Sequence, residues 1–422
     1  MKTEYAENGG FLQRDSVEHE EYAEAYSTES REVDRKDGAD LLEKVLCRDN
    51  LNKAYKRVKA NKGASGVDGM TIDEALPWLK EHRNELLESI RNGKYKPSPV
   101  RRVEIPKDNG GVRKLGIPTV IDRIIQQAIA QVLIPIYEPK FSDGSYGYRP
   151  GRSAKNAIQQ VREYAEEGYR YAVSLDLSRY FDTLNHEILL NQLRKEVKDE
   201  RVIQIIKRYL KSGVMENGVV MDTEEGSPQG GNLSPLLANI YLDEFDKEFE
   251  RRGVPCVRYA DDIVLLAKSE RAAKRLLETS TTYLENKLKL TVNRKKSKVT
   301  SVYAIRNFKF LGFALGRNGN GTFIRVHPKS WKKMKAKLKS LSSRRHVQSV
   351  IPALCKIREY MRGWLNYYGI AAMKHAVEEL NGWLYHRIRM SIWKMWKRPR
   401  SKMKYLMKLG IPKYYAHMAA NS

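Results

Sequence analysis

Two adjacent aspartates, Asp261 and Asp262, interrupt a mainly apolar run from Val257 to Ala267, and this pattern limits how the segment can fold. The apolar residues on either side predict two short strands joined by a tight turn. The hairpin would present two neighbouring carboxylates at its tip, where they repel each other unless a cation neutralises them. Taken alone, the two residues are explained as simply by a polar turn.

A third carboxylate ends an alternating segment upstream. Between Tyr171 and Leu177 large apolar residues alternate with small ones, and Asp176 falls in the register of the small ones, away from the buried face of the predicted strand. Mg²⁺ in proteins typically binds one or two carboxylates together with substrate phosphates. Carboxylates from two strands therefore suggest a site for two metal ions about 3.5–4 Å apart, one activating a hydroxyl and one holding a leaving group.

The chain of 422 residues is long enough for two to three domains of roughly 150 residues. Its 77 Lys and Arg against 51 Asp and Glu give a net charge of +26, which favours a polyanionic partner, either nucleic acid or an anionic membrane. The chain has neither a membrane-length apolar run nor an apolar stretch near its acidic N-terminus, so we expect a cytoplasmic protein. The three cysteines lie too far apart for a disulfide framework or a Cys-rich zinc module.

The charge is distributed unevenly along the chain. Residues 1–40 hold 12 acidic and 5 basic residues without a helical or strand period, which predicts a flexible acidic tail. Residues 328–422 hold 22 basic and 3 acidic residues and five of the six tryptophans. Trp331, Met334 and Leu338 recur there at helical spacing and predict an amphipathic helix. The opposite face of this helix carries Lys332, Lys333, Lys335 and Lys337. It is either a solvated surface or a contact surface for nucleic-acid phosphates, and the charge and the tryptophans favour the second.

Periodicity predicts a mixture of helices and short strands, which is typical of the α+β class and not of a regular alternation of strand and helix. The predicted helices cover residues 41–60, 73–91, 119–137, 153–167, 185–211, 233–251 and 270–287. The predicted strands cover residues 100–106, 171–177, 257–267 and 308–313. Residues 103–118 in addition predict a hairpin of two basic strands around an Asp-Asn-Gly-Gly turn.

The succession of Asp176, Ser227–Asp246 and Tyr259–Asp262 resembles reverse transcriptases, most of all those encoded by bacterial group II introns, and the resemblance covers about residues 41–400. It implies a right-hand polymerase with fingers, a palm whose antiparallel sheet carries the aspartates, and an α-helical thumb or maturase (X) domain. The implied parts are the acidic tail 1–40, fingers 41–170, palm 171–315, thumb 316–390 and a basic segment 391–422 that begins a DNA-binding region.

The resemblance also implies an activity. It implies an RNA-directed DNA polymerase that extends a DNA or RNA primer on an RNA template with deoxynucleoside triphosphates, and with Mg²⁺ as a cofactor that Mn²⁺ could replace. The other implied partners are group II intron RNA, whose splicing and retrohoming the protein would assist, and target DNA. The implied location is a ribonucleoprotein in the bacterial cytoplasm, without a membrane.

By the same resemblance, Asp176 and Asp261 hold both metal ions, and Asp262 completes the carboxylate cluster. Phe181 matches the aromatic residue that packs beneath the incoming sugar and excludes a 2′-hydroxyl, although ordinary core packing would also explain it. Gln229 is similar to the residue that braces the nascent base pair, although a plain helix entry would explain it as well.

Backbone contacts and basic residues complete the implied polymerase site. Gly230 and Gly231 permit close backbone approach, and residues 308–313 are similar to the primer-grip hairpin. By the resemblance, Lys107 and Arg113 clamp the triphosphate, and Lys296 donates a proton to pyrophosphate. Arg149 and Arg152 meet template phosphates. All five residues could otherwise be ordinary exposed cations.

The segment Arg358–Ile370 looks like the maturase region, which binds intron RNA. We assign the RNA contacts to its exposed cations, Arg358 and Arg362. Trp364 and Tyr368 lie four residues apart on one helix and could contact RNA or pack in the core, and we favour the core.

Two other functions compete with a mobile-intron polymerase. A noncatalytic splicing cofactor would have lost Asp176 or the Asp261–Asp262 pair, which are intact, and a defence or retron-like reverse transcriptase would lack the Arg358–Ile370 pattern. The resemblance also has limits. The sequence shows no Cys/His cluster of a nuclease of the HNH type and no acidic set that suggests an RNase H domain.

Overall fold

The structure, a computed structural model, describes residues 40–106, 111–216, 219–221, 225–227, 230–343 and 350–421. The described residues up to Thr300 form one compact unit, and those from Ser301 onward form another. The predicted acidic tail lies outside the described residues except for its last residue, and Lys107 and Gln229 lie outside them as well. The predicted boundaries between fingers, palm and thumb remain predictions.

Helices of the first unit follow the predicted periodicity. They are α2 (Leu41–Leu46), α3 (Arg48–Ala60), α4 (Ile72–Arg91), α5 (Val120–Tyr137), α6 (Ala154–Glu166), α7 (His186–Glu196), α8 (Glu200–Leu210), α9 (Ser234–Arg251) and α10 (Glu270–Thr282). Two predicted helices, 41–60 and 185–211, are wrong as single helices. The first breaks at the extended residue Cys47, and the second breaks before Asp199. The Asp199 carboxylate accepts the Leu42 amide at 2.9 Å and also caps α8, so one side chain stabilises two helix starts.

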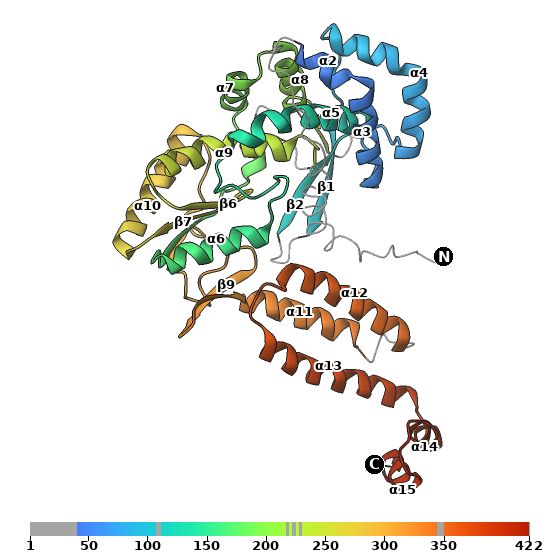
Figure 1. Ribbon diagram of the computed structural model, residues 1–422. Helices are drawn as coiled ribbons and strands as arrows, with labels where there is room; N and C mark the ends of the chain where they lie inside the picture. The colour runs from blue at the N-terminus through green and yellow to red at the C-terminus, as the bar shows by residue number, and fades with distance from the viewer. Residues whose placement is uncertain are drawn as a thin grey trace. The chain divides into compact units, whose positions relative to one another are not determined.

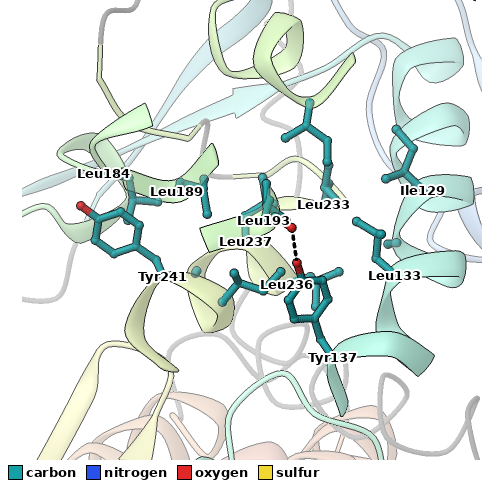
Figure 2. Close-up of a cluster of buried hydrophobic side chains, with 14 of the residues drawn as sticks. Ile129, Leu133, Tyr137, Leu184, Leu189, Leu193, Leu233, Leu236, Leu237 and Tyr241 are labelled. Carbon is teal, nitrogen blue, oxygen red and sulfur yellow. Dashed lines mark hydrogen bonds between the residues drawn. The ribbon is translucent and has the colours of Figure 1, made fainter. Parts of the chain in front are cut away.

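The core of the first unit lies where α5, α7 and α9 meet, as Figure 2 shows. Leu133 of α5, Leu193 of α7 and Leu237 of α9 are all buried there. The Tyr137 hydroxyl donates a hydrogen bond of 3.1 Å to the Leu193 carbonyl, which satisfies a polar group inside this apolar cluster. The packing fixes the start of α9, which directly follows the Gly230–Gly231 segment.

Two sheets belong to the first unit (Figure 1). The first has the strand order β6-β7-β3-β8, in which β7 pairs antiparallel with both β6 and β3. Its strands are β3 (Tyr171–Leu175), β6 (Cys256–Tyr259), β7 (Asp262–Ala267) and β8 (Lys298–Ser301). The second has the order β2-β1-β4-β5, with strands β1 (Val100–Pro106), β2 (Val112–Ile117), β4 (Val214–Glu216) and β5 (Val219–Met221). The antiparallel pairing of β1 with β2 confirms the predicted basic hairpin.

The second unit is a hairpin followed by helices. Its elements are β9 (Phe313–Asn318), β10 (Gly321–Val326), α11 (Pro328–Leu341), α12 (Val350–Tyr368), α13 (Lys374–Met395), α14 (Pro399–Lys408) and α15 (Lys413–Asn421). The predicted amphipathic helix is confirmed as α11, with Met334 and Leu338 buried. The predicted strand 308–313 is wrong: β9 begins at Phe313, because Leu311 and Gly312 take left-handed conformations and turn the chain just before it.

The three cysteines are free thiols. Cys47, between α2 and α3, and Cys355, in α12, are exposed, whereas Cys256, the first residue of β6, is buried. Within the described part of the chain, no helix is both long and apolar enough to cross a membrane.

Candidate active site

The β6–β7 hairpin presents the two adjacent aspartates at its tip, as the sequence predicts. Tyr259 pairs with Asp262 across the hairpin, so Ala260 and Asp261 form the connecting turn. Ala260 has a φ of 55°, a left-handed conformation that is uncommon for a residue with a Cβ. This turn is therefore a backbone position that its surroundings must hold in place.

The strand pairing brings the third aspartate next to this tip. Leu175 of β3 pairs with Ile263 of β7, so the next residue, Asp176, lies opposite Asp262 and shares its face of the sheet. The backbone of Asp176 is held by the segment that follows the hairpin. Its N–H donates to Ser297 Oγ at 3.0 Å, and its carbonyl accepts the Asn293 N–H at 2.8 Å. Two elements thus fix the origin of this side chain.

Electrostatics show that these groups are close enough to interact. Burial raises the pKa of the Asp261 carboxyl, and the charge of Asp176 raises it further, whereas Arg113 and Arg258 oppose the rise. Asp261 nevertheless keeps an exposed surface, and water at that surface moderates the effect of burial. The exposed part of this carboxylate is where a cation from solution can reach it.

Two cations from separate segments accompany the carboxylates. Lys296 Nζ lies 3.4 Å from Asp176 Oδ2, and both side chains are partly exposed. Arg113, in β2, is exposed and acts electrostatically on Asp261. Since surface ion pairs are screened by water, these contacts contribute little to stability. They do place positive charge where a phosphate-containing ligand would approach.

Among the residues that the structure describes, no group of three His, Cys, Asp or Glu side chains is arranged to hold a metal ion. The side chains nevertheless fit Mg²⁺ in chemical type, since Asp176 and Asp261 offer carboxylate oxygens that repel each other and remain open to solvent. Mg²⁺ usually completes its coordination with water and substrate phosphates, so it needs no cage made of protein groups alone.

Phe181 lies in the short 3₁₀ turn Tyr180–Asp182 that follows β3. Its side chain is half-buried and packs against the core and against the ring of Tyr180, with centroids 5.3 Å apart. Its carbonyl accepts the Ser227 N–H at 2.6 Å, which ties this turn to the segment before α9. Phe181 therefore has both a packed part and an open part, and its role as a sugar gate stays a prediction.

The expected close backbone approach is confirmed at Gly230. This residue has a φ of 123°, and a Cβ added to it would lie 2.6 Å from the Gly116 carbonyl oxygen of β2. At Gly231 the approach is to a side chain instead, because an added Cβ would lie 2.7 Å from Gln126 Oε1. Gln229 lies outside the described residues, so its predicted contact with the base pair stays a prediction.

The structure contradicts the predicted phosphate contact of Arg149. Its side chain is 3% exposed and pairs with Glu138, while its remaining N–H groups donate to the carbonyls of Ser142, Ser145 and Glu138. A guanidinium enclosed in this way orders its own loop and has no donor left for template. Arg152 is partly exposed and pairs with Asp143 at 2.6 Å, so its contact with template stays a prediction.

Basic residues of the second unit lie on exposed helix faces. The four predicted lysines of α11 are exposed, and Lys335 lies 5.1 Å above the ring of Trp383. Arg358 and Arg362 are exposed on α12. Trp364 is buried, packing 4.7 Å from Tyr368 between ring centroids, which confirms that both rings belong to the core.

Sequence reasoning missed a buried charged network behind the hairpin. Arg258 of β6 forms an ion pair with Asp246 of α9, and both side chains are almost completely inaccessible to water. Burial raises the pKa of Asp246, and the charge of Arg258 opposes that rise. A signal was available for Arg258, which stands between apolar residues of a strand that must be buried, but not for Asp246, whose neighbours in the sequence are mostly charged.

Family models match both units of the chain. The model described as "Reverse transcriptase (RNA-dependent DNA polymerase)" matches residues 105–315, and the model "Group II intron, maturase-specific domain" matches residues 331–410. The first match contains the three aspartates, and the second contains most of α11 and all of α12 and α13.

Curated relatives agree with these matches. The chain is 31% identical to the group II intron-encoded protein LtrA of Lactococcus lactis over 73% of this chain, and it spans 60% of the length of that relative. It is 34% identical to protein YkfC of Escherichia coli over 66% of this chain and 83% of the relative. It is 36% identical to the putative COX1/OXI3 intron 2 protein of Saccharomyces cerevisiae over 47% of this chain and 23% of the relative. The chain therefore belongs to the group II intron reverse transcriptase family and carries both the polymerase domain and the maturase-specific domain of that family.

Proposed function

We propose that the protein is an RNA-directed DNA polymerase that also binds group II intron RNA and assists its splicing and retrohoming. The observation that carries the catalytic part is the placement of Asp261 beside Asp176, with Arg113 and Lys296 next to them. Two repelling carboxylates and two cations from four separate segments match the needs of nucleotidyl transfer better than those of a structural turn.

In the proposed reaction, the primer 3′-hydroxyl oxygen attacks the α-phosphorus of a deoxynucleoside triphosphate. The new phosphorus–oxygen bond forms as the bond to the β-phosphate bridging oxygen breaks, the hydroxyl proton passes to water, and pyrophosphate leaves. Asp176 and Asp261 would hold two Mg²⁺ ions, with Asp262 on the same face as Asp176. When bound, the ions would lower the pKa of the hydroxyl and neutralise charge on the leaving group.

The cations of the site bind and protonate the leaving group in this proposal. Arg113 and Lys107 would contact the triphosphate, and Gln229 would contact the nascent base pair. Lys107 and Gln229 lie outside the described residues. Lys296 would donate a proton from Nζ to the departing pyrophosphate. This ammonium group lies 3.4 Å from Asp176 Oδ2, so it is already placed beside the carboxylates of the proposed site.

The first test is primer extension with purified protein on an RNA template, using deoxynucleotides and Mg²⁺ or Mn²⁺. We expect extension that EDTA abolishes. A protein that binds intron RNA tightly but never extends a primer would instead be the noncatalytic splicing cofactor. An active enzyme without preference for intron RNA over other structured RNA would favour the defence or retron-like function.

Phe181→Val should raise ribonucleotide incorporation about ten- to hundredfold relative to deoxynucleotide incorporation, because the smaller side chain leaves room for a 2′-hydroxyl. The measurement is the ratio of kcat/KM for the two sugars with the same base. Phe181→Tyr keeps the ring and should keep the discrimination. An unchanged ratio in the valine variant would show that Phe181 only packs in the core.

For RNA binding we propose the exposed basic faces of α11 and α12, including Arg358 and Arg362, as contacts to phosphates of intron RNA and primer–template. Arg152 would add a template contact in the first unit. We further propose target DNA as a partner and a ribonucleoprotein in the bacterial cytoplasm as the location.

Changing Lys332, Lys333 and Lys337 together to Gln should weaken RNA binding at low salt and flatten the plot of log affinity against log salt by about 2. Lys335 is left unchanged because it packs over Trp383. Changing the same three lysines to Arg is the matched control and should keep the slope. An unchanged slope combined with lost single-nucleotide addition would mean that α11 supports the polymerase site and does not hold RNA.

A further inference from the structure

The catalytic hairpin is anchored by a guanidinium that no water can reach. Arg258 is fully buried, and its Nε donates to both oxygens of Asp246 at 2.9 and 2.8 Å, while Nη2 lies 2.6 Å from Oδ2. Asp246 lies in α9 and Arg258 in β6, so the pair joins the helix behind the sheet to the strand that leads into the turn.

The remaining donors of Arg258 are directed at two further segments. Nη1 donates to Asn239 Oδ1 at 2.9 Å and to the Ala260 carbonyl at 3.1 Å, and Nη2 donates to Ser145 Oγ at 2.8 Å. The Ala260 carbonyl belongs to the peptide bond that leads into Asp261. Arg258 therefore binds directly to the peptide unit from which the Asp261 side chain departs.

The other side of the turn is closed by a loop. Gly147 lies so near that a Cβ added to it would be 2.3 Å from the Ala260 nitrogen. The Asn239 amide spans this space, donating from Nδ2 to the Gly147 carbonyl at 2.7 Å while its oxygen accepts from Arg258. The left-handed residue Ala260 is thus held by the hydrogen bond from Arg258 on one side and by the close approach of Gly147 on the other.

We propose that Arg258 is a positioning residue, which holds the Ala260–Asp261 peptide so that the Asp261 carboxylate points to the same metal site as Asp176. The inference rests on the proposed polymerase function and deepens it. Stability alone does not explain this arrangement, because a buried ion pair can usually be replaced by apolar residues without loss of stability. A guanidinium has the additional ability to bind a carboxylate, an amide and a carbonyl simultaneously in fixed directions.

The discriminating variant is Arg258→Lys. Lysine keeps the charge opposite Asp246, but one ammonium group cannot reproduce the fork that reaches Asp246, Asn239 and the Ala260 carbonyl together. We expect kcat for single-nucleotide addition to fall about ten- to hundredfold, since a small misplacement of a catalytic group has effects of this size. The KM for deoxynucleotides and the affinity for primer–template should stay near their original values, because neither ligand contacts Arg258.

Metal affinity gives a readout that does not depend on turnover. Electron paramagnetic resonance of free Mn²⁺, in the complex of full-length protein with primer–template, should show a Kd for Mn²⁺ raised by about tenfold or more in Arg258→Lys. Ser145→Ala is the matched control. It removes one hydrogen bond of Arg258 but leaves its bonds to Asp246 and the Ala260 carbonyl, so both kcat and the Mn²⁺ Kd should stay near the original values.

A third variant covers the case in which lysine disturbs folding. Ala260→Gly removes the steric cost of the left-handed conformation, so it should make the melting temperature less sensitive to Arg258→Lys than it is in the original background. An original protein that does not extend primers would overturn the polymerase function itself. If the original protein is active, two results would overturn the positioning role alone. In the first, Arg258→Lys keeps the original kcat and Mn²⁺ Kd. In the second, Arg258→Lys and Ser145→Ala lower kcat and Mn²⁺ affinity to the same extent.

Discussion

Asp261→Ala should abolish primer extension, lowering the rate by at least about 10³-fold, while the affinity for RNA stays unchanged. In the proposed function the carboxylate is needed only to hold a metal ion at the reacting atoms, whereas RNA affinity would come from the net charge of +26 distributed over the chain. Single-turnover extension and filter binding on the same RNA template measure the two properties separately.

The same variant should melt at a slightly higher temperature near neutral pH. Burial and Asp176 raise the pKa of Asp261, so the ionised carboxylate disfavours the folded state at pH values above that raised pKa. The cost disappears as the pH falls through the raised pKa and the group becomes protonated. The difference in melting temperature should therefore shrink in acid.

A matched control for this experiment is Asp73→Ala in α4. The side chain of Asp73 is 82% exposed and lies near Lys59, far along the chain from the aspartates of the site. It should leave extension unaffected. If Asp261→Ala lost RNA binding and extension together in a protein that still folds, Asp261 would be a structural residue and the proposed site would be wrong.

Gly147→Ala should have the largest effect on stability, lowering the free energy of unfolding by about 1–3 kcal/mol and stopping extension. A Cβ there would lie 2.3 Å from the Ala260 nitrogen and 2.9 Å from the Tyr259 carbonyl carbon. Both neighbours are backbone atoms at the tip of the β6–β7 hairpin, so they can yield only if the turn moves. Thermal melting and primer extension on the same preparation measure the two effects.

Gly382→Ala provides the contrasting case. Gly382 lies inside α13, and a Cβ added there would meet nothing within 4 Å. Alanine should therefore stabilise that helix by about 1 kcal/mol, as expected from helix propensity. If both alanine variants behaved alike, the close approach of Gly147 to the turn would not exist in solution.

Local sequence pattern was sufficient for most elements of the fold. Alternation in β3 and apolar runs on both sides of Asp261 predicted strands, and helical spacing of Met334 and Leu338 predicted α11, because each pattern reports which residues are buried. The two broken helices were missed because apolar spacing alone does not mark where they break. Helix α2 ends at Cys47, whose backbone is extended, and α8 begins after Asp199, whose carboxylate caps it and also accepts the distant Leu42 amide. Periodicity contains no information about such a contact.

The candidate site shows the same division. Asp176 and Asp261 could be proposed from the sequence because an acidic residue at the end of an apolar strand is rarely needed for packing. Arg149 was misassigned because the resemblance of its segment to a template-facing segment does not distinguish exposed from buried cations, and only the fold shows that backbone carbonyls surround it. Arg258 was missed for the opposite reason, since its partner Asp246 belongs to a different element.

Two of the three cysteines are exposed, so the protein can be labelled at their thiols with fluorescent dyes. Cys47 belongs to the first unit and Cys355 to the second, and both thiols are exposed. Cys256 is buried, and burial raises the pKa of its thiol, so maleimide dyes should react with it far more slowly. The unaltered chain can therefore carry one donor and one acceptor dye. Energy transfer between them would follow the two units as template, primer and nucleotide are added in turn.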